Sequence, residues 1–335
     1  MLTVSYYRSI DATAFELTPT SLATMHRLSA LLPSFALLSP ARLPPAVLLL
    51  LIAAIWGSSY SVVKTALNWY PVAGVIAIRF LLTALLLAPY WLRLPAAQQR
   101  TTMAVAAPTG LGLLAIFFAE TAGVAHTSAG NAAFLVSLCL LLTPGVEWAW
   151  FGRRPAARLW LAALISLLGT WLLTGLAASG LNTGDALMLL AALIRAFQTC
   201  LTTRLMRDQA VDSLGLTAAQ GLIVGSGALA ILLITTPAGG LPPLPQAAAF
   251  WGTLVYLTLF CTLFAFWAMN RALAQSSPTQ VSLLLGSEPL WGALFAVHWL
   301  GEPLAPAGWI GGLMIAGAAV WVSLPERRVA VVQAA

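Results

Sequence analysis

Long runs of apolar residues, separated by short polar or turn-forming segments, extend along almost the whole chain. A helix needs about 20 consecutive apolar residues to cross a hydrocarbon core of about 30 Å. Ten runs reach or approach this length: residues 44–65, 72–91, 102–124, 129–150, 158–177, 184–203, 213–236, 247–270, 278–299 and 304–324. Most connections carry Gly, Pro or Asn, which favour turns. The pattern therefore predicts an all-α polytopic membrane protein with ten transmembrane helices.

The composition supports this prediction and excludes a soluble domain. Of the 335 residues, 60% are hydrophobic and 8% are charged, and the mean hydropathy is +0.90. Soluble domains carry about 25% charged residues. This chain cannot cover a water-facing surface, so a lipid bilayer is its expected surrounding. The net charge of +6 is typical of basic loops at a membrane face, and we expect no nucleic-acid partner.

The basic residues also predict the orientation of the chain. If the N-terminus is cytoplasmic, the segments on that side hold Arg8, Arg27, Arg42, Arg93, Arg100, Arg153, Arg154, Arg158, Arg204, Arg207, Arg271, Arg327 and Arg328. The opposite face holds Lys64, and Arg79 and Arg195 lie within spans. Because basic loops stay in the cytoplasm, we expect both termini there.

The two ends of the chain lie outside the apolar runs. Residues 1–43 are mixed in character and punctuated by Pro, and we expect a disordered tail. Two alternatives stay open: a signal-like segment around the short apolar patch 28–38, and a true start at Met25. Residues 325–335 are expected to form a cytoplasmic C-terminal tail.

The two halves of the chain resemble each other. Residues 127–160 can be laid on 276–309 without gaps, so that Ser128 falls on Ser277 and Trp160 on Trp309. Each half, 44–177 and 184–324, holds five spans, so the second half must enter the membrane from the opposite side. The chain is thus predicted to form two inverted five-helix repeats, which in secondary transporters enclose a site near the midplane and rock around it by alternating access.

Several motifs resemble those of the drug/metabolite transporter superfamily, EamA type. They are WGSSYSVVKTAL, AIRF, TSAGNAAFL, GDALMLLAALIRA, LISLLGTWLL, SEPLWGALFAVHWLGEPL and GWIGGLMIAGAAV. The resemblance covers about residues 44–324 and implies ten helices in two EamA repeats. It also implies a bacterial inner-membrane exporter of amino acids or similar metabolites, usually driven by an ion gradient. The chain departs from the family at Leu140, where Pro is usual, and at Arg195, where Trp is usual.

Five ionisable residues fall inside the spans: Arg79, Glu120, Glu147, Arg195 and Glu288. A charge at the bilayer centre costs at least about 2.5–3.5 kcal/mol, so each must face a partner or a watery cavity. Arg195 and Glu288 lie near the middle of their spans, and we expect an ion pair across the cavity. Alternatively, Arg195 binds a substrate carboxylate while Glu288 faces an ammonium group or a proton, or the pair is purely structural.

The other charges have different expected partners. Arg79 lies about seven residues, or roughly 10 Å, from the outer end of its span. We expect it to bond helix-end carbonyls or to pair with Glu120, with direct contact to substrate as the alternative. Glu147 lies near the cytoplasmic end of its span, where we expect an ion pair with Arg153 or Arg154.

Polar and aromatic residues within the spans are candidates for a pocket. Together with the charges, the candidate substrate-binding residues are Trp56, Ser59, Tyr60, Arg79, Asn131, Arg195, Gln198, Gln220 and Glu288. A hydroxyl or amide in hydrocarbon needs a partner, so each faces another helix or the cavity. As a set, they fit a small amphipathic solute. The alternative for any one of them is a hydrogen bond that joins two helices.

Other functional classes lack support in the sequence. No metal-ligand spacing, Walker loop or dinucleotide motif occurs, so we expect no cofactor, metal, catalytic residue or disulfide. An intramembrane enzyme is the alternative function, but the span positions place Glu120, Glu147 and Glu288 at different depths. A non-transporting sensor is a third possibility. A coupling proton stays open, as does the choice between a monomer and a weak dimer. Gly221 and Gly225, and likewise Gly308 and Gly312, allow close helix contacts, which we expect within one chain, with dimerisation as the alternative.

Overall fold

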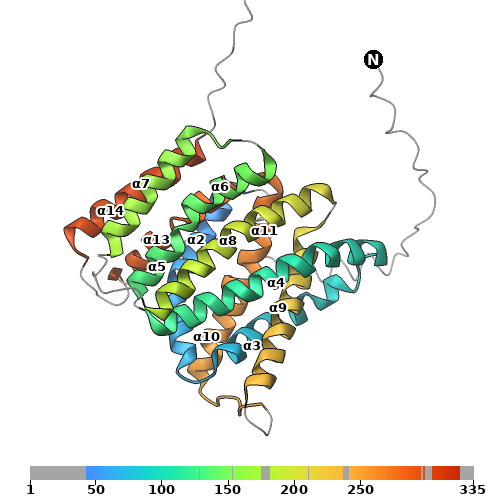
Figure 1. Ribbon diagram of the computed structural model, residues 1–335. Helices are drawn as coiled ribbons and strands as arrows, with labels where there is room; N and C mark the ends of the chain where they lie inside the picture. The colour runs from blue at the N-terminus through green and yellow to red at the C-terminus, as the bar shows by residue number, and fades with distance from the viewer. Residues whose placement is uncertain are drawn as a thin grey trace, which may run out of the picture. The chain divides into compact units, whose positions relative to one another are not determined.

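The computed structural model describes residues 43–127, 129–152, 154–174, 182–209, 211–236, 241–295, 297–298 and 304–324. Both predicted tails fall outside these residues, apart from Leu43. The side chains of Tyr60 and Asn131 are also outside the described part. Every regular element that is described is a helix (Figure 1), which confirms the all-α prediction.

Helices follow one another with short connections. The first half contains α2 (Pro45–Leu67), α3 (Val72–Trp91), α4 (Ala96–His126), α5 (Ala129–Ser137), α6 (Cys139–Phe151) and α7 (Ala157–Thr174). The second half contains α8 (Thr183–Asp208), α9 (Ser213–Thr235), α10 (Ala248–Thr258), η2 (Leu259–Phe264), α11 (Ala265–Gln275), α12 (Pro278–Leu285), α13 (Glu288–Phe295) and α14 (Pro306–Ser323). Within the described residues, nine helical segments are long and apolar enough to cross a membrane. The tenth apolar run is divided between α12 and α13.

Two predicted spans are broken near their middles. The run 129–150 is divided into α5 and α6 at Leu138, and the run 278–299 is divided at residues 286–287. In a continuous helix, the N–H of residue 289 would donate to the carbonyl of Leu285. Pro289 has no N–H, and α12 ends at Leu285, where this hydrogen bond is lost. When Ser128 is laid on Ser277, Leu138 falls on Ser287. The two breaks are therefore at matching positions of the repeat.

Helix packing is symmetric between the halves. α3 of the first half packs along α9 of the second, and α7 packs along α14 at one side of Figure 1. α2 of the first half packs on α11 and α13, and α8 of the second half packs correspondingly on α4 and α6. Exchanging the halves exchanges these contacts, as expected for a structural repeat.

Close backbone contacts join the halves at glycines. A Cβ atom added to Gly57 in α2 would lie 2.6 Å from the carbonyl oxygen of Glu288 in α13. One added to Gly225 in α9 would lie 2.8 Å from the backbone nitrogen of Leu81 in α3, so the predicted close contact at this glycine is confirmed. Gly308 meets its own Leu304 instead, and Gly311 makes the close approach to Gly169 of α7.

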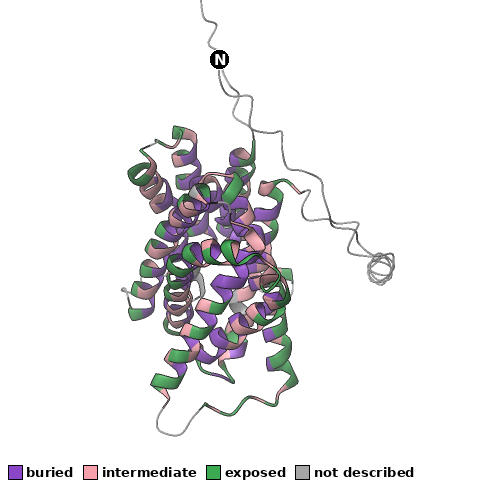
Figure 2. Cartoon of the chain, turned by 90° about the vertical axis from the view of Figure 1, so that its right-hand side faces the viewer, coloured by how far each residue is buried: buried purple, intermediate pink, exposed green. Residues whose placement is uncertain are grey.

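Buried residues lie mostly on the inner faces of this bundle and exposed residues on its outer faces (Figure 2). Many exposed residues are large and apolar, for example Ile234 at 83% and Leu313 at 73% exposed. Soluble monomers rarely expose apolar surface on this scale. The outer faces are therefore suited to contact with lipid chains.

Candidate functional site

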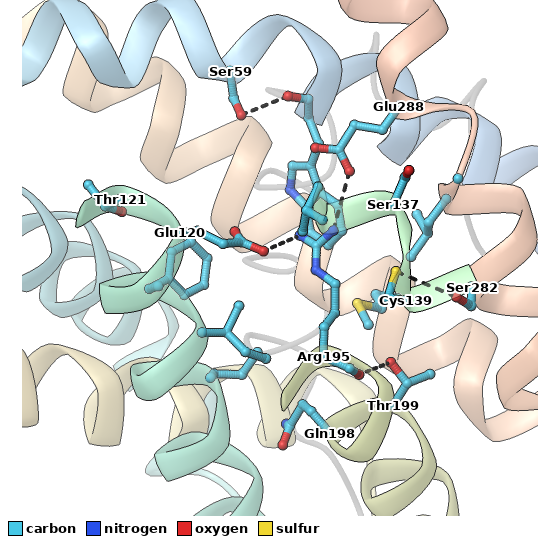
Figure 3. A pocket seen from close by; sticks show the side chains of 18 of the residues that line it. Ser59, Glu120, Thr121, Ser137, Cys139, Arg195, Gln198, Thr199, Ser282 and Glu288 are labelled. Atoms are coloured by element: carbon cyan, nitrogen blue, oxygen red, sulfur yellow. Dashed lines mark hydrogen bonds and ion pairs between the residues drawn. The ribbon is translucent and has the colours of Figure 1, made fainter. Parts of the chain in front are cut away.

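A cavity of about 100 Å³ lies at the contact between the two halves. Its walls come from α2, α3, α4, α5 and α6 of the first half and from α8, α11, α12 and α13 of the second. Six of the predicted site residues line it: Trp56, Ser59, Arg79, Arg195, Gln198 and Glu288. Figure 3 shows Arg195 reaching into this space from α8.

The Arg195 guanidinium lies between two carboxylates. Its Nη2 is 3.1 Å from Oε1 of Glu120 in α4, and its Nη1 is 3.5 Å from Oε2 of Glu288 in α13 (Figure 3). The side chain of Arg195 is 20% exposed, that of Glu120 is 12% exposed and that of Glu288 is 7% exposed. The guanidinium carbon also lies 5.6 Å from the centre of the Trp56 ring, in cation–π range. This Glu120–Arg195–Glu288 cluster, called the charge triad below, joins both halves.

The triad partly matches and partly corrects the sequence interpretation. The expected Arg195–Glu288 ion pair is present. Glu120, however, pairs with Arg195 and not with Arg79. The inference that Glu120 and Glu288 lie at different depths was wrong, because both reach one guanidinium. Depth was counted from the ends of the apolar runs, whereas α4 begins at Ala96, before its run, and helix tilt changes the depth of every residue.

Arg79 holds a distorted segment of another helix. Its Nη2 donates a 2.9 Å hydrogen bond to the carbonyl oxygen of Cys261, and its Nε donates to the hydroxyl of Thr262. Both acceptors lie in the π-helical turn η2, where wider turns leave the normal α-helical bonding pattern. The guanidinium carbon lies 5.0 Å from the centre of the Phe117 ring. The expected carbonyl acceptor is present, but the expected location at a helix end was wrong, because Cys261 and Thr262 lie in the middle of a span.

Trp56 connects the triad to the same turn. Its indole Nε1 donates a 2.9 Å hydrogen bond to the Cys261 carbonyl, which therefore accepts from both Trp56 and Arg79. The indole ring packs 5.6 Å from the ring of Phe266 in α11. The Ser59 hydroxyl donates to the Trp56 carbonyl at 2.8 Å (Figure 3). α2 therefore presents Trp56 to the cavity in a fixed position.

Gln220 lies behind the cavity wall, in a network of buried amides and hydroxyls. Gln198 Nε2 donates to the carbonyl of Thr109 at 2.7 Å, and Gln220 Nε2 donates to the Thr109 hydroxyl at 2.9 Å. Asn270 Nδ2 donates to Gln220 Oε1 at 2.9 Å and to Thr217 Oγ1 at 3.1 Å. This network joins α4, α8, α9 and α11. For Gln220 it favours the joining of helices over contact with a solute.

The structure adds lining residues that were not selected from the sequence. They include Phe117, Glu120, Ser137, Cys139, Phe266 and Ser282. Cys139 Sγ lies 3.9 Å from the Ser282 hydroxyl, which also accepts a 3.2 Å hydrogen bond from Thr143. The repeat contained a signal for Cys139, because it falls on Glu288 when the halves are aligned.

Glu147 has a different partner from the one expected. Its Oε2 accepts hydrogen bonds from the backbone N–H of Thr279 at 2.8 Å and from the Thr279 hydroxyl at 2.5 Å. Arg154 lies 4.4 Å from the Trp148 ring instead, and Arg153 is outside the described residues. Glu147 therefore joins α6 to the start of α12.

The described residues contain no cluster of three or more His, Cys, Asp or Glu side chains placed to hold a metal ion. Cys139, Cys200 and Cys261 are free and buried. The described cavity wall offers two carboxylates, two guanidinium groups and several aromatic rings.

Comparisons with known proteins agree with this geometry. The profile of the EamA-like transporter family matches residues 43–175 and 182–324, one match for each half. An uncharacterized transporter of Archaeoglobus fulgidus is 25% identical over 82% of this chain and 84% of its own. The uncharacterized inner membrane transporter YedA of Escherichia coli is 27% identical over 81% of this chain and 87% of its own.

Two further comparisons concern a named export function and the fold. A probable terminal-alkyne amino-acid exporter of Streptantibioticus cattleyicolor is 24% identical over 84% of this chain and 92% of its own. A solved crystal structure superposes with a TM-score of 0.67 at 18% identity, covering 85% of this chain and 98% of that one. At this identity the crystal structure supports the fold alone.

Proposed function

This chain belongs to the EamA-like transporter family, and from that premise we propose that it is a secondary transporter that exports an amino acid or a similar small amphipathic solute by alternating access. The observation that carries the proposal is the cavity at the contact between the halves, with the charge triad at its centre. A transporter needs a site that both halves share, because their relative movement then exposes it to each side in turn.

The lining favours a solute with both polar and apolar parts. Glu120, Arg195 and Glu288 offer charges of both signs, while Phe117 and Phe266 offer ring faces. An α-amino acid carries an ammonium group, a carboxylate and a side chain, and fits this combination. The similarity to a probable terminal-alkyne amino-acid exporter points in the same direction.

We expect the protein to reside in a bacterial inner membrane with both termini in the cytoplasm. The Lys and Arg asymmetry supports this orientation. A green fluorescent protein joined to the C-terminus should be fluorescent in cells, since it folds poorly after export through the membrane. Alkaline phosphatase at the same place should be inactive, and an active phosphatase would contradict the orientation.

Transport itself can be tested with purified protein in liposomes. Vesicles loaded with one unlabelled L-amino acid at a time should take up the same labelled amino acid by counterflow, faster than protein-free vesicles. Glu288→Gln should lower that rate strongly, whereas Arg204→Gln, which alters an exposed charge on α8, should not. If no member of the amino-acid panel exceeds the protein-free rate, the proposed substrate class is wrong.

A further inference from the structure

We propose that Arg195 is a tethered counter-cation, which occupies the two carboxylates of the triad in the empty carrier and yields them to a zwitterionic substrate. The substrate ammonium replaces the guanidinium at Glu288, and the substrate carboxylate accepts hydrogen bonds from the guanidinium so released. Transport is therefore independent of a proton gradient. This inference rests on the proposed function and adds the chemistry of loading.

The contacts within the triad are suited to exchange. Strong hydrogen bonds between a guanidinium and a carboxylate are about 2.7–2.9 Å long, whereas Arg195 lies 3.1 Å from Glu120 and 3.5 Å from Glu288. The Oε1 atom of Glu120 is buried and accepts no hydrogen bond despite its nearness to the guanidinium. The Arg195 guanidinium is thus shared between the two carboxylates, and its distance to each is longer than that of a strong hydrogen bond.

The second cation of the cavity wall is committed elsewhere. Arg79 also lines the cavity, but it donates to the Cys261 carbonyl and the Thr262 hydroxyl and so holds the turn η2. Among the described lining residues, Arg195 is therefore the cation placed to exchange its partners. Its own position over Trp56 is one that an ammonium group can also take, because the ring face attracts either cation.

The numbers of charges explain why a zwitterion is expected. Among the described lining residues, Arg79 and Arg195 balance Glu120 and Glu288, and the remaining titratable group is the Cys139 thiol. These groups face the cavity from α3, α8, α4, α13 and α6. A zwitterion adds no net charge, so the empty and loaded carriers carry the same charge through the membrane. A net cation or anion would leave an unpaired charge in a low-dielectric region.

The balance of charges within the cavity also determines how the empty carrier reorients after it has released its substrate. With Arg195 on its carboxylates, the empty carrier contains no unpaired charge that a proton must neutralise. It can therefore reorient alone, and net export follows the solute's own gradient. Without Arg195, the two carboxylates would lie together in the empty cavity. A proton would then have to enter for the carrier to return.

The test compares proton dependence in wild type and variants, using an L-amino acid that the counterflow screen has shown to be transported. In wild-type vesicles clamped with valinomycin and potassium, a pH difference of one unit should not drive accumulation. In vesicles with Arg195→Gln, the same pH difference should drive accumulation of the amino acid. One coupled proton can concentrate the amino acid up to about tenfold, because a pH difference of one unit is a tenfold proton gradient. Arg195→Lys keeps a tethered cation and should behave as wild type, as should the control Arg204→Gln.

A second variant guards against misfolding of Arg195→Gln. The double variant Arg195→Gln/Glu120→Gln removes one charge of each sign and leaves Glu288 to bind the ammonium group. Its empty cavity still holds one cation, Arg79, and one anion, Glu288, so this variant should stay independent of the proton gradient, and dependence would contradict the inference. Size-exclusion chromatography after reconstitution establishes that each variant is folded.

Competition on the wild-type protein gives an independent measure. The amine that lacks the carboxylate, and the N-acetylated acid that lacks the ammonium group, should each inhibit at least about tenfold more weakly than the amino acid, since each loses one charge-assisted contact. Accumulation by wild type in response to the pH difference would overturn the inference, as would equal inhibition by the amine alone. Both results would leave the proposed export function intact, whereas failure of the counterflow screen would remove that function itself.

Discussion

At the scale of single residues, the distinction between Arg79 and Arg195 shows how a buried charge can serve structure or binding. Both are guanidinium groups in apolar spans, and both line the cavity. Arg195 contacts two carboxylates, while Arg79 contacts a carbonyl and a hydroxyl of η2. The two arginines therefore differ in their partners, and the proposed exchange concerns Arg195 alone.

This role of Arg79 predicts a loss of stability on substitution. Arg79→Gln removes two hydrogen bonds from a charged donor, each worth about 1.5–3 kcal/mol. We expect the thermal midpoint in detergent, followed by fluorescence-detected size exclusion, to fall by several degrees, and Arg79→Lys to give an intermediate value. Arg93→Gln, at an exposed position, is the matched control. Equal midpoints for Arg79→Gln and Arg93→Gln would contradict the role.

Prediction from sequence reached some of these residues and not others. The cost of burying a charge led directly to Arg195 and Glu288, because an unpaired ion in hydrocarbon is too costly to persist. Glu120 was identified as buried but was assigned Arg79 as its partner instead of Arg195, because the length of an apolar run does not reveal how far the helix is tilted. Gln220 was a reasonable candidate by polarity, yet its partners Thr109 and Asn270 lie on other helices, and sequence spacing does not relate them.

At the scale of elements, the position of Glu288 depends on the contact between α2 and α13. Gly57 lets the α2 backbone approach Glu288 and Gly292 so closely that an added Cβ would lie 2.6 Å from the Glu288 carbonyl oxygen. Trp56, the preceding residue, lies against Arg195. The close approach thus places the aromatic face of Trp56 and the carboxylate of Glu288 next to the same guanidinium.

Substitution at Gly57 tests this contact. Gly57→Ala should push α2 and α13 apart, with an overpacking cost of about 1–3 kcal/mol, and should lower both the thermal midpoint and the counterflow rate. Gly252→Ala in α10 is the control, because an added Cβ there meets nothing within 4 Å. It should be neutral or stabilising by up to about 1 kcal/mol through helix propensity. A fully active and stable Gly57→Ala protein would show that the close approach is dispensable.

The elements themselves were predictable to the extent that length and apolarity determine them. All ten runs correspond to helical segments, and Pro289 indicated the freed carbonyl of Leu285 where α12 ends. The break at Leu138 and the turn η2 carry no such signal, because LFCTLF contains neither Pro nor Gly. The shape of η2 follows from contacts with Arg79 and Trp56, which come from other helices.

At the scale of the whole molecule, the repeat is the feature that joins sequence, fold and function. The alignment of 127–160 with 276–309 predicted that corresponding helices would be equivalent, and the symmetric packing of α2 and α8 agrees with it. The alignment could not predict the charge distribution at the cavity, because the repeat has diverged there. Cys139 falls on Glu288, so one half supplies a thiol where the other supplies a carboxylate.

Cys139 provides a native reporter for movement between the halves. It lines the cavity, whereas Cys200 and Cys261 are each 0% exposed. In a Cys200→Ala/Cys261→Ala protein, N-ethylmaleimide should label Cys139, and a transported amino acid at ten times its Kd should slow labelling about tenfold, by occupying the site. The same protein with Cys139→Ala should not be labelled, which identifies the reacting thiol.

The side from which a reagent reaches Cys139 distinguishes alternating access from a cavity open on one side. In vesicles of a single orientation, a membrane-impermeant maleimide should label Cys139 when added outside and also when sealed inside, because the carrier exposes the same site to each face in turn. Solute should protect in both cases. Labelling from one side alone, in protein that still performs counterflow, would mean that the solute pathway does not pass Cys139, and the cavity between the halves would then not be the transport site.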